Sequence, residues 1–146
     1  MIRRIGKRPG LEKSKFVIYD PEMIPNFVVH FEIPVLDLDR AIKFYSAVFE
    51  TSFTREEIDG YQMAMFPVED EAFGASGALV QGDVYKPSTE GCFLYFGVES
   101  IDETMARALA NGGTEMYAKK SNGELGWVAE IGDTEGNRIA LHQPAD

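Results

Sequence analysis

One pattern occurs twice in this sequence, and an internal repeat constrains the fold more than any single motif. The segment Phe31–Phe49 reads as a strand that leads into a helix, and Leu94–Gly112 reads the same way 63 positions later. Apolar residues occupy matching positions in the two strands, and an apolar residue followed by Asp opens each helix. The repeat predicts two copies of one supersecondary unit within a shared core.

Hydrophobic periodicity predicts the same order of elements in both copies. In the first copy, Phe27–Val35 alternates with period two and Leu38–Phe49 carries an apolar helical stripe. Strands are then expected at Phe53–Ile58, Tyr61–Phe66 and Ala78–Gly82, the first two joined by an Asp59-Gly60 hairpin. The second copy is expected to contain a strand Cys92–Val98, a helix Ile101–Asn111, and strands near Glu115–Ala118, Trp127–Ile131 and Arg138–Gln143. The predicted fold class is α+β: two βαβββ modules, at about 27–85 and 92–143, that form a cupped mixed sheet with outer helices.

Composition restricts the class of protein. The chain has 146 residues, of which 45% are hydrophobic, enough for one packed domain. A single cysteine excludes an intrachain disulfide and fits a reducing, cytoplasmic location. No apolar run is long enough to span a membrane, so no membrane partner is expected. The net charge of −10 argues against nucleic acid, whose phosphates would be repelled.

The charge is unevenly distributed along the chain. Residues 1–16 carry six basic residues and one acid, a formal charge of +5, and the rest carries −15. We therefore divide the chain into a basic N-terminal arm, residues 1–22, and a domain, residues 23–146. The arm is interpreted either as a segment that lies on an acidic surface of its own or a partner subunit, or as a solvated tail.

Candidate binding residues follow from the strand faces. Helices pack on the apolar face of a sheet, so the opposite, free face can line a cavity. In the first copy, this face is expected to present His30 and Glu32, with Gln81 at the end of a later strand. In the second copy, the equivalent residues are Phe93 and Tyr95, and in the last strand they are Arg138, Ala140 and His142.

The sequence resembles the vicinal-oxygen-chelate superfamily, which includes glyoxalase I, extradiol dioxygenases, and the bleomycin and fosfomycin resistance proteins. The resemblance rests on HFEIPVLDLDRAIKFYSAVF, the GALVQ strand, the ANGG helix end and DTEGNRIALH, within residues 27–143. It implies paired βαβββ modules that form a cup around a ligand. It also implies a homodimer, since modules of this family commonly pair across subunits.

Enzymes of this family commonly hold a divalent metal with one residue from each of four strands. Carried over by position, these places fall on His30, Gln81, Phe93 and Ala140, where the family usually has histidine, glutamate, histidine and glutamate. Phenylalanine and alanine cannot coordinate a metal. We therefore expect no cofactor at the usual site. The fallback is a rearranged set of His30, Glu32 and His142, which would resemble a two-histidine, one-carboxylate site.

Three functions remain open at this point. The first is a protein that binds a small molecule without the usual metal, with His30, Glu32, Gln81, Phe93, Tyr95, Arg138 and His142 as ligand-binding candidates and Trp127 and methionines as further walls. The second is a metal-dependent lyase, isomerase or dioxygenase with the rearranged ligand set. The third is a non-catalytic interaction module. No catalytic residue is assigned, and the first function is favoured.

Overall fold

The structure is a computed structural model, and it describes residues 26–69, 72 and 74–146. The expected basic arm lies outside the described residues. The first half of the described chain contains β1 (His30–Val35), α1 (Leu38–Phe49), β2 (Thr54–Ile58), β3 (Tyr61–Met65) and β4 (Ser76–Gln81). The second half contains β5 (Tyr95–Gly97), α2 (Ile101–Ala110), β6 (Thr114–Ser121), the short 3-10 helix η1 (Gly123–Leu125), β7 (Trp127–Gly132) and β8 (Arg138–Gln143).

The strands form two four-stranded sheets with the same topology. The first sheet has the order β1-β4-β3-β2 and the second has the order β5-β8-β7-β6. In each sheet the first strand pairs in parallel with the last, and the other pairs are antiparallel. The prediction of two βαβββ modules is confirmed.

Several element boundaries differ from the prediction. Strand β5 has only three residues, so Phe93 precedes it, although backbone bonds from Ala140 to Leu94 and from Val98 to His142 continue the pairing on either side. Strand β6 is longer than expected, and two register shifts interrupt its pairing with β7. The hairpin at Asp59-Gly60 is confirmed, with positive φ at both residues as a type I′ turn requires.

Local signals fix where the two helices begin. The side chain of Asp37 accepts a hydrogen bond of 3.0 Å from the Arg40 backbone N–H, and Ser100 caps α2 in the same way through Glu103. Both helices bury one apolar stripe against their sheets. None of the helices in the described part of the chain is long and apolar enough to cross a membrane.

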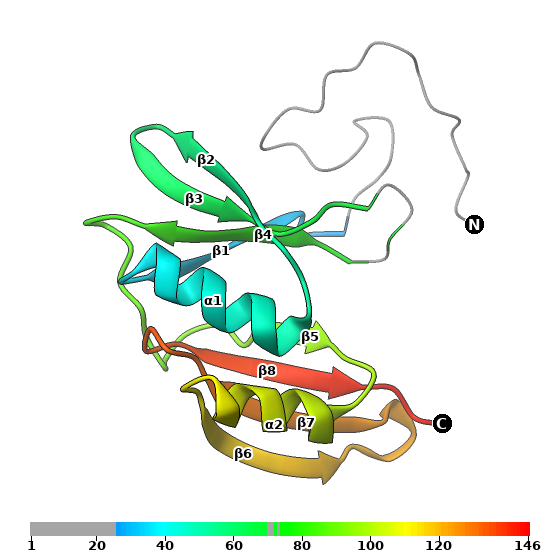
Figure 1. The fold of residues 1–146 in the computed structure, drawn as a ribbon. Helices are drawn as coiled ribbons and strands as arrows, with labels where there is room; N and C mark the ends of the chain where they lie inside the picture. Colours follow the sequence, from blue (N-terminus) through cyan, green and yellow to red (C-terminus); the bar gives the residue numbers. More distant parts are fainter. Residues whose placement is uncertain (1–25, 70–71, 73) are drawn as a thin grey trace.

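The two modules share one core. Helix α1 contacts α2, and an aromatic cluster joins β1 to β5, because the Phe31 and Phe96 rings lie 5.7 Å apart. Phe49 and Phe66 also pack on Phe96. Figure 1 shows the first sheet above the second, with β1 and β5 on the sides of the sheets that face each other. Side chains of β1 and β5 therefore pack together where the two sheets face each other.

The turn between β7 and β8, residues 133–137, ties the modules together with buried polar groups. The Asp133 carboxylate accepts a 2.7 Å hydrogen bond from the buried Tyr45 hydroxyl of α1. Asn137 donates to the Pro34 carbonyl oxygen, and the Glu135 carboxylate accepts from the backbone N–H groups of Leu36 and Asp37. These bonds fix the end of β1 and the start of α1 relative to the second sheet.

Candidate functional site

The free face of the first sheet carries two of the three polar candidates that the sequence placed there. His30 and Glu32 point away from the helix, and the His30 Nε2 lies 4.0 Å from the Glu32 Oε2. The Tyr85 hydroxyl donates a 3.3 Å hydrogen bond to Glu32 Oε1. Burial, followed by the charge of Glu32 and this bond, raises the pKa of Tyr85.

An apolar patch surrounds these groups. Met63, Ala78 and Val80 are buried on the same face, and Ile58, Tyr61, Met65 and Tyr85 pack against them. The Tyr61 and Tyr85 rings meet edge to face, 5.2 Å apart. The first sheet thus offers a carboxylate and an imidazole beside apolar and aromatic surface.

The free face of the second sheet carries a second group of candidates. The Arg138 guanidinium lies over the Phe93 ring, 5.6 Å from its centroid, and its Nε lies 3.5 Å from the Glu130 Oε2. Tyr95 and Glu130 flank Ala140 as its partners on either side, so all three share this face. Phe93 and Tyr95 are half exposed, at 49% and 59%. Aromatic rings beside a charge pair form a surface suited to an organic ligand.

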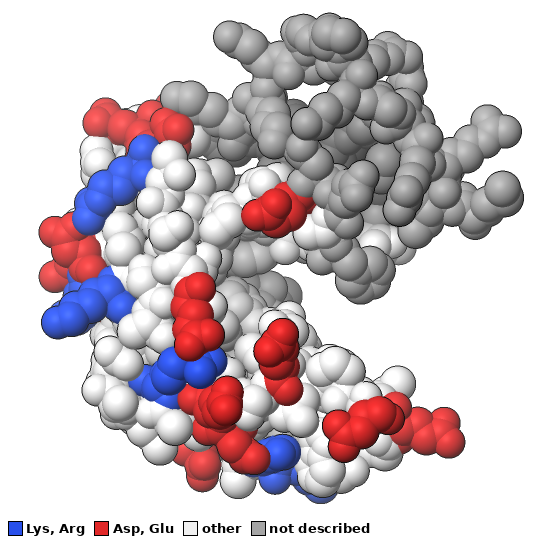
Figure 2. Space-filling view, turned by 45° about the vertical axis from the view of Figure 1, so that its right-hand side comes forward, with Lys and Arg blue, Asp and Glu red and all other residues white. Residues whose placement is uncertain are grey.

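The free faces of both sheets turn away from the helices, and together they are called the cup below. Figure 2 shows the molecule hollowed between its upper and lower parts, with acidic side chains bordering the hollow. His142 lies two residues beyond Ala140 on β8, and its Nε2 lies 2.7 Å from the Leu125 carbonyl oxygen. This ring nitrogen is therefore already engaged at the side of the cup.

Gln81 does not belong to the cup, and the predicted placement of this residue is wrong. Its register partner on β1 is Val35, a core residue, and its Oε1 accepts a 2.8 Å hydrogen bond from the Leu38 backbone N–H at the start of α1. Ala78 and Val80 occupy the free face of β4 instead, because alternate residues of a strand point to opposite faces. Trp127 likewise lies outside the cup, where Lys119 stacks on its ring.

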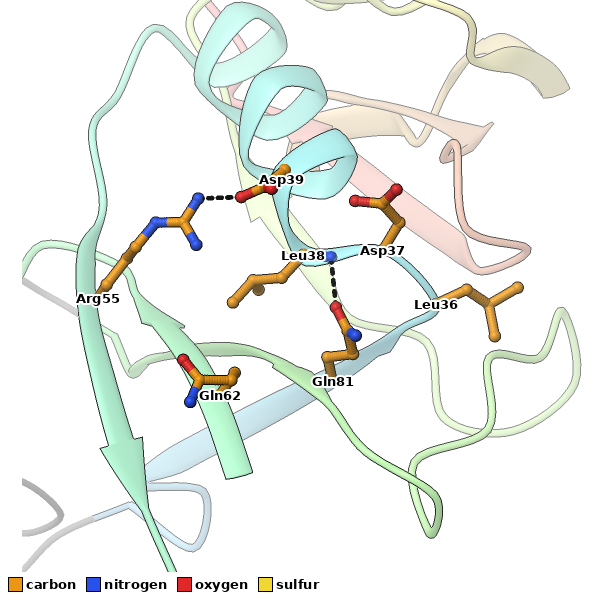
Figure 3. Close-up of a pocket in the computed structure, with 7 residues that line it drawn as sticks. All are labelled: Leu36, Asp37, Leu38, Asp39, Arg55, Gln62 and Gln81. Carbon is orange, nitrogen blue, oxygen red and sulfur yellow. Dashed lines mark hydrogen bonds and ion pairs between the residues drawn. The ribbon is translucent and has the colours of Figure 1, made fainter. Parts of the chain in front are cut away.

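Gln81 lines a separate polar pocket of about 320 Å³ at the first turn of α1. Figure 3 shows this pocket with the Gln81 amide directed at Leu38 and the Arg55 guanidinium paired with Asp39. Gln62, also in its wall, donates to Glu57. The polar side chains that line this pocket have partners within the first sheet and α1, and two of these contacts, Gln81 to Leu38 and Arg55 to Asp39, hold the start of α1.

Comparison with known proteins identifies the fold. The model of the Glyoxalase/Bleomycin resistance protein/Dioxygenase superfamily matches residues 27–141. The chain belongs to this superfamily. No curated protein matches the chain.

Solved structures of superfamily members share the fold. A glyoxalase/bleomycin resistance protein/dioxygenase domain from Frankia is 20% identical, with a TM-score of 0.65 over 84% of this chain and 100% of that one. The trypanothione-dependent glyoxalase I of Leishmania major is 22% identical, with a TM-score of 0.63 over 82% of this chain and 87% of that one. A glyoxalase/bleomycin resistance protein from Albidiferax ferrireducens is 20% identical, with a TM-score of 0.62 over 82% of this chain and 100% of that one. At these identities the likeness establishes the fold alone.

The residues at the superfamily's usual metal places do not fit a metal ion. Phe93 and Ala140 offer no lone pair, and the Gln81 carbonyl oxygen already accepts from α1. Among residues 26–69, 72 and 74–146, no group of three or more histidine, cysteine, aspartate or glutamate side chains is arranged to hold an ion. The fallback set of His30, Glu32 and His142 is therefore not gathered into one site.

Sequence reasoning missed two residues of the cup, Tyr85 and Glu130. Tyr85 follows β4 in an irregular segment, so no periodicity assigned its ring to a face. Glu130 could have been found, because β7 alternates and its register with β8 places Glu130 beside Ala140. A carboxylate is thus present on the strand next to the position where the superfamily usually has one.

Proposed function

We propose that this protein binds a small organic molecule in the cup and that no step of its function runs through a metal at the usual four-ligand place. The observation that carries the proposal is a pair of buried polar atoms with unused hydrogen-bonding capacity. Glu32 Oε2 on the first sheet and Arg138 Nε on the second are buried and have no hydrogen-bond partner. Buried polar groups are normally satisfied, so such atoms indicate a missing partner.

The surroundings of these two atoms define the ligand class. Tyr85 and Ala78 lie beside Glu32, and Phe93 lies beneath Arg138. A ligand with an aromatic or aliphatic body would pack on these side chains. A hydrogen-bond donor on the ligand would suit Glu32, and an acceptor would suit Arg138. A homodimer in the cytoplasm remains our prediction for the assembled protein.

A thermal-shift screen of the full chain with aromatic carboxylates and aromatic amines tests the proposal. At ten times its dissociation constant a ligand stabilises the folded state by about 1.4 kcal/mol, which raises the melting temperature by about 3–5 °C. Arg138→Gln should weaken the binding of the best carboxylate about tenfold or more by calorimetry, because a charged hydrogen bond contributes about 1.5–3 kcal/mol.

Arg55→Gln is the matched control, since Arg55 lies on the other face of the first sheet and pairs with Asp39. Equal loss of binding in both variants would mean that the ligand does not use the cup. Elemental analysis of untagged protein adds an independent check. One equivalent of zinc, nickel or iron, lost in His30→Ala, would refute the metal-free reading.

A further inference from the structure

The free face of the first sheet is acidic as well as apolar. Glu32 lies opposite Ala78 and Glu56 lies opposite Met63, so both carboxylates project from the same face as the apolar patch. The Tyr61 hydroxyl lies 3.4 Å from Asp83, which follows β4. The negative charges of Asp83 and Asp59 add to the effect of burial in raising the pKa of Tyr61. This wall of the cup is therefore negatively charged.

Lysine and arginine are scarce on the four strands of this sheet, and the basic group beside Glu32 is the His30 imidazole, at 4.0 Å. Arg55 is the one lysine or arginine within β1, β2, β3 and β4, all of which the structure describes. Arg55 lies opposite Ala64, a core residue, and its guanidinium pairs with Asp39 of α1. It therefore projects from the helix side of the sheet, away from the cup.

Glu32 offers a carboxylate oxygen with unused hydrogen-bonding capacity on this face. Its side chain is 29% exposed, and its Oε2 is buried without a hydrogen bond. A buried acceptor that lost its water and found no donor costs about 1–3 kcal/mol, and more when it is charged. A cationic group with an apolar neighbour would satisfy both Glu32 and the patch of Met63, Tyr61 and Tyr85.

The chain itself carries a segment of this chemistry. Residues 1–16 have a formal charge of +5, and the apolar run Phe16–Tyr19 follows directly. The segment leads into β1, the strand that carries Glu32. Ten residues, 20–29, reach at most about 35 Å when extended. A sheet of four strands is only about 15 Å wide between its outer strands, so the segment is long enough to turn back across this face.

We propose that residues 1–22 bind across the free face of the first sheet of the same chain, with a basic side chain at Glu32 and Phe16–Tyr19 against the apolar patch. The segment then covers one wall of the cup, and a ligand with a cationic or amine group competes with it. The competition rests on the proposed function, whereas the binding of the segment does not.

Limited digestion of the full chain by trypsin tests the binding, because its cleavage sites in residues 1–16 are the basic side chains themselves. A synthetic peptide of residues 1–22, digested alone under the same conditions, gives the unprotected rate. At about 20 mM salt the segment should be cleaved about tenfold more slowly than the peptide. At about 0.5 M salt, where charges are screened beyond a few ångströms, the difference should fall to about threefold or less.

Glu32→Gln and Glu57→Gln form a matched pair of variants. Both remove one negative charge from the first sheet, but Glu57 lies on the opposite face, where it accepts from Gln62. Glu32→Gln should speed cleavage of the segment about threefold or more at low salt, and Glu57→Gln should leave the rate unchanged. Melting curves of both variants confirm that the domain remains folded during digestion.

Three outcomes would overturn the proposal. Cleavage at the rate of the free peptide would show that the segment is a solvated tail. Protection that both variants leave unchanged would place the segment on another surface. Protection that rises with protein concentration would show that the segment binds a second copy of the chain. None of these outcomes depends on a ligand, so a failed thermal-shift screen would refute the proposed function while leaving the binding of the segment intact.

Discussion

Replacing Glu135 by glutamine should destabilise the domain strongly, although Glu135 lies in a turn and not in a helix or strand. Its side chain is completely buried and accepts hydrogen bonds from five donors. Two are the backbone N–H groups of Leu36 and Asp37, two belong to the Arg40 guanidinium and one is the Thr134 hydroxyl. Glutamine keeps one acceptor oxygen and turns an NH2 group toward these donors.

The size of the effect follows from these contacts. A hydrogen bond to a charged group contributes about 1.5–3 kcal/mol, but bonds within one network are not additive. The Arg40 side chain is about half exposed, so water recovers part of what it loses. The two backbone N–H groups of the β1–α1 connection both donate to one oxygen of this buried carboxylate, and they lose a charged acceptor with it. We expect a loss of about 2–4 kcal/mol, or about 6–12 °C in melting temperature for a domain of this size.

Urea denaturation at pH 7 measures the loss, and Glu124→Gln is the control. Glu124 lies exposed in η1, so the same change in charge there should alter the free energy of unfolding by less than about 0.5 kcal/mol. A loss below about 1 kcal/mol in Glu135→Gln would refute the reasoning. It would mean that the carboxylate contributes little to holding the modules together.

The pH dependence gives a second test of the same contact. Burial alone would raise the pKa of Glu135, but hydrogen bonds from Arg40, Thr134 and the Asp37 backbone outweigh it and hold the pKa below its ordinary value. Because the pKa is depressed in the folded state, the stabilisation is complete above the unfolded value of about 4.3 and is lost as the pH falls through the folded value. The difference in stability between wild type and Glu135→Gln should therefore shrink below about pH 4. A difference that stays constant down to about pH 2 would contradict this assignment.

Two further predictions concern the turns that hold the second module. Tyr45→Phe removes the buried hydroxyl that donates to Asp133 and should lower the free energy of unfolding, measured by urea denaturation, by about 1–3 kcal/mol. Tyr117→Phe, at an exposed position, should leave the free energy of unfolding unchanged. Equal losses in the two variants would contradict the prediction. Gly126→Ala should cost about 2 kcal/mol or more, because φ is +110° and a Cβ there would overlap the Gln143 carbonyl oxygen. Gly123→Ala, at φ +64° in open space, should cost only about 1 kcal/mol, and the reverse order would refute the argument.

The repeat and the periodicity were sufficient to predict both modules and the face of most candidates. His30, Glu32 and Arg138 point where alternation placed them, because each is followed along its strand by a residue that packs in the core. Gln81 was misplaced because β4 reads Gly-Ala-Leu-Val before it, an apolar run without alternation. In a strand buried on both faces, polarity does not reveal which residues face the helix.

The buried hydrogen bonds by which residues 133–137 join the two modules could not be predicted from the sequence. Asp133–Asn137 lies between the predicted strands Trp127–Ile131 and Arg138–Gln143, and acidic and amide residues in such turns are usually solvated. Here Asp133, Glu135 and Asn137 are buried, because their partners come from residues 88–103 positions away. Local sequence carries no information about such partners, and only the folded arrangement of the two modules supplies them.

The contact between the two modules has a consequence for how the chain can assemble. Strand ladders run only within each module, and every hydrogen bond described above between the modules has a side chain at one end. A module therefore recognises its complement through side chains, whichever chain supplies it. Two chains that exchange their second modules would bury the same surfaces as a single chain whose two modules pack together. The free energies of the exchanged dimer and the monomer would then differ only through the path of the linker and the entropy of association. A dimer formed by this exchange would use an interface identical to the interior of a single chain.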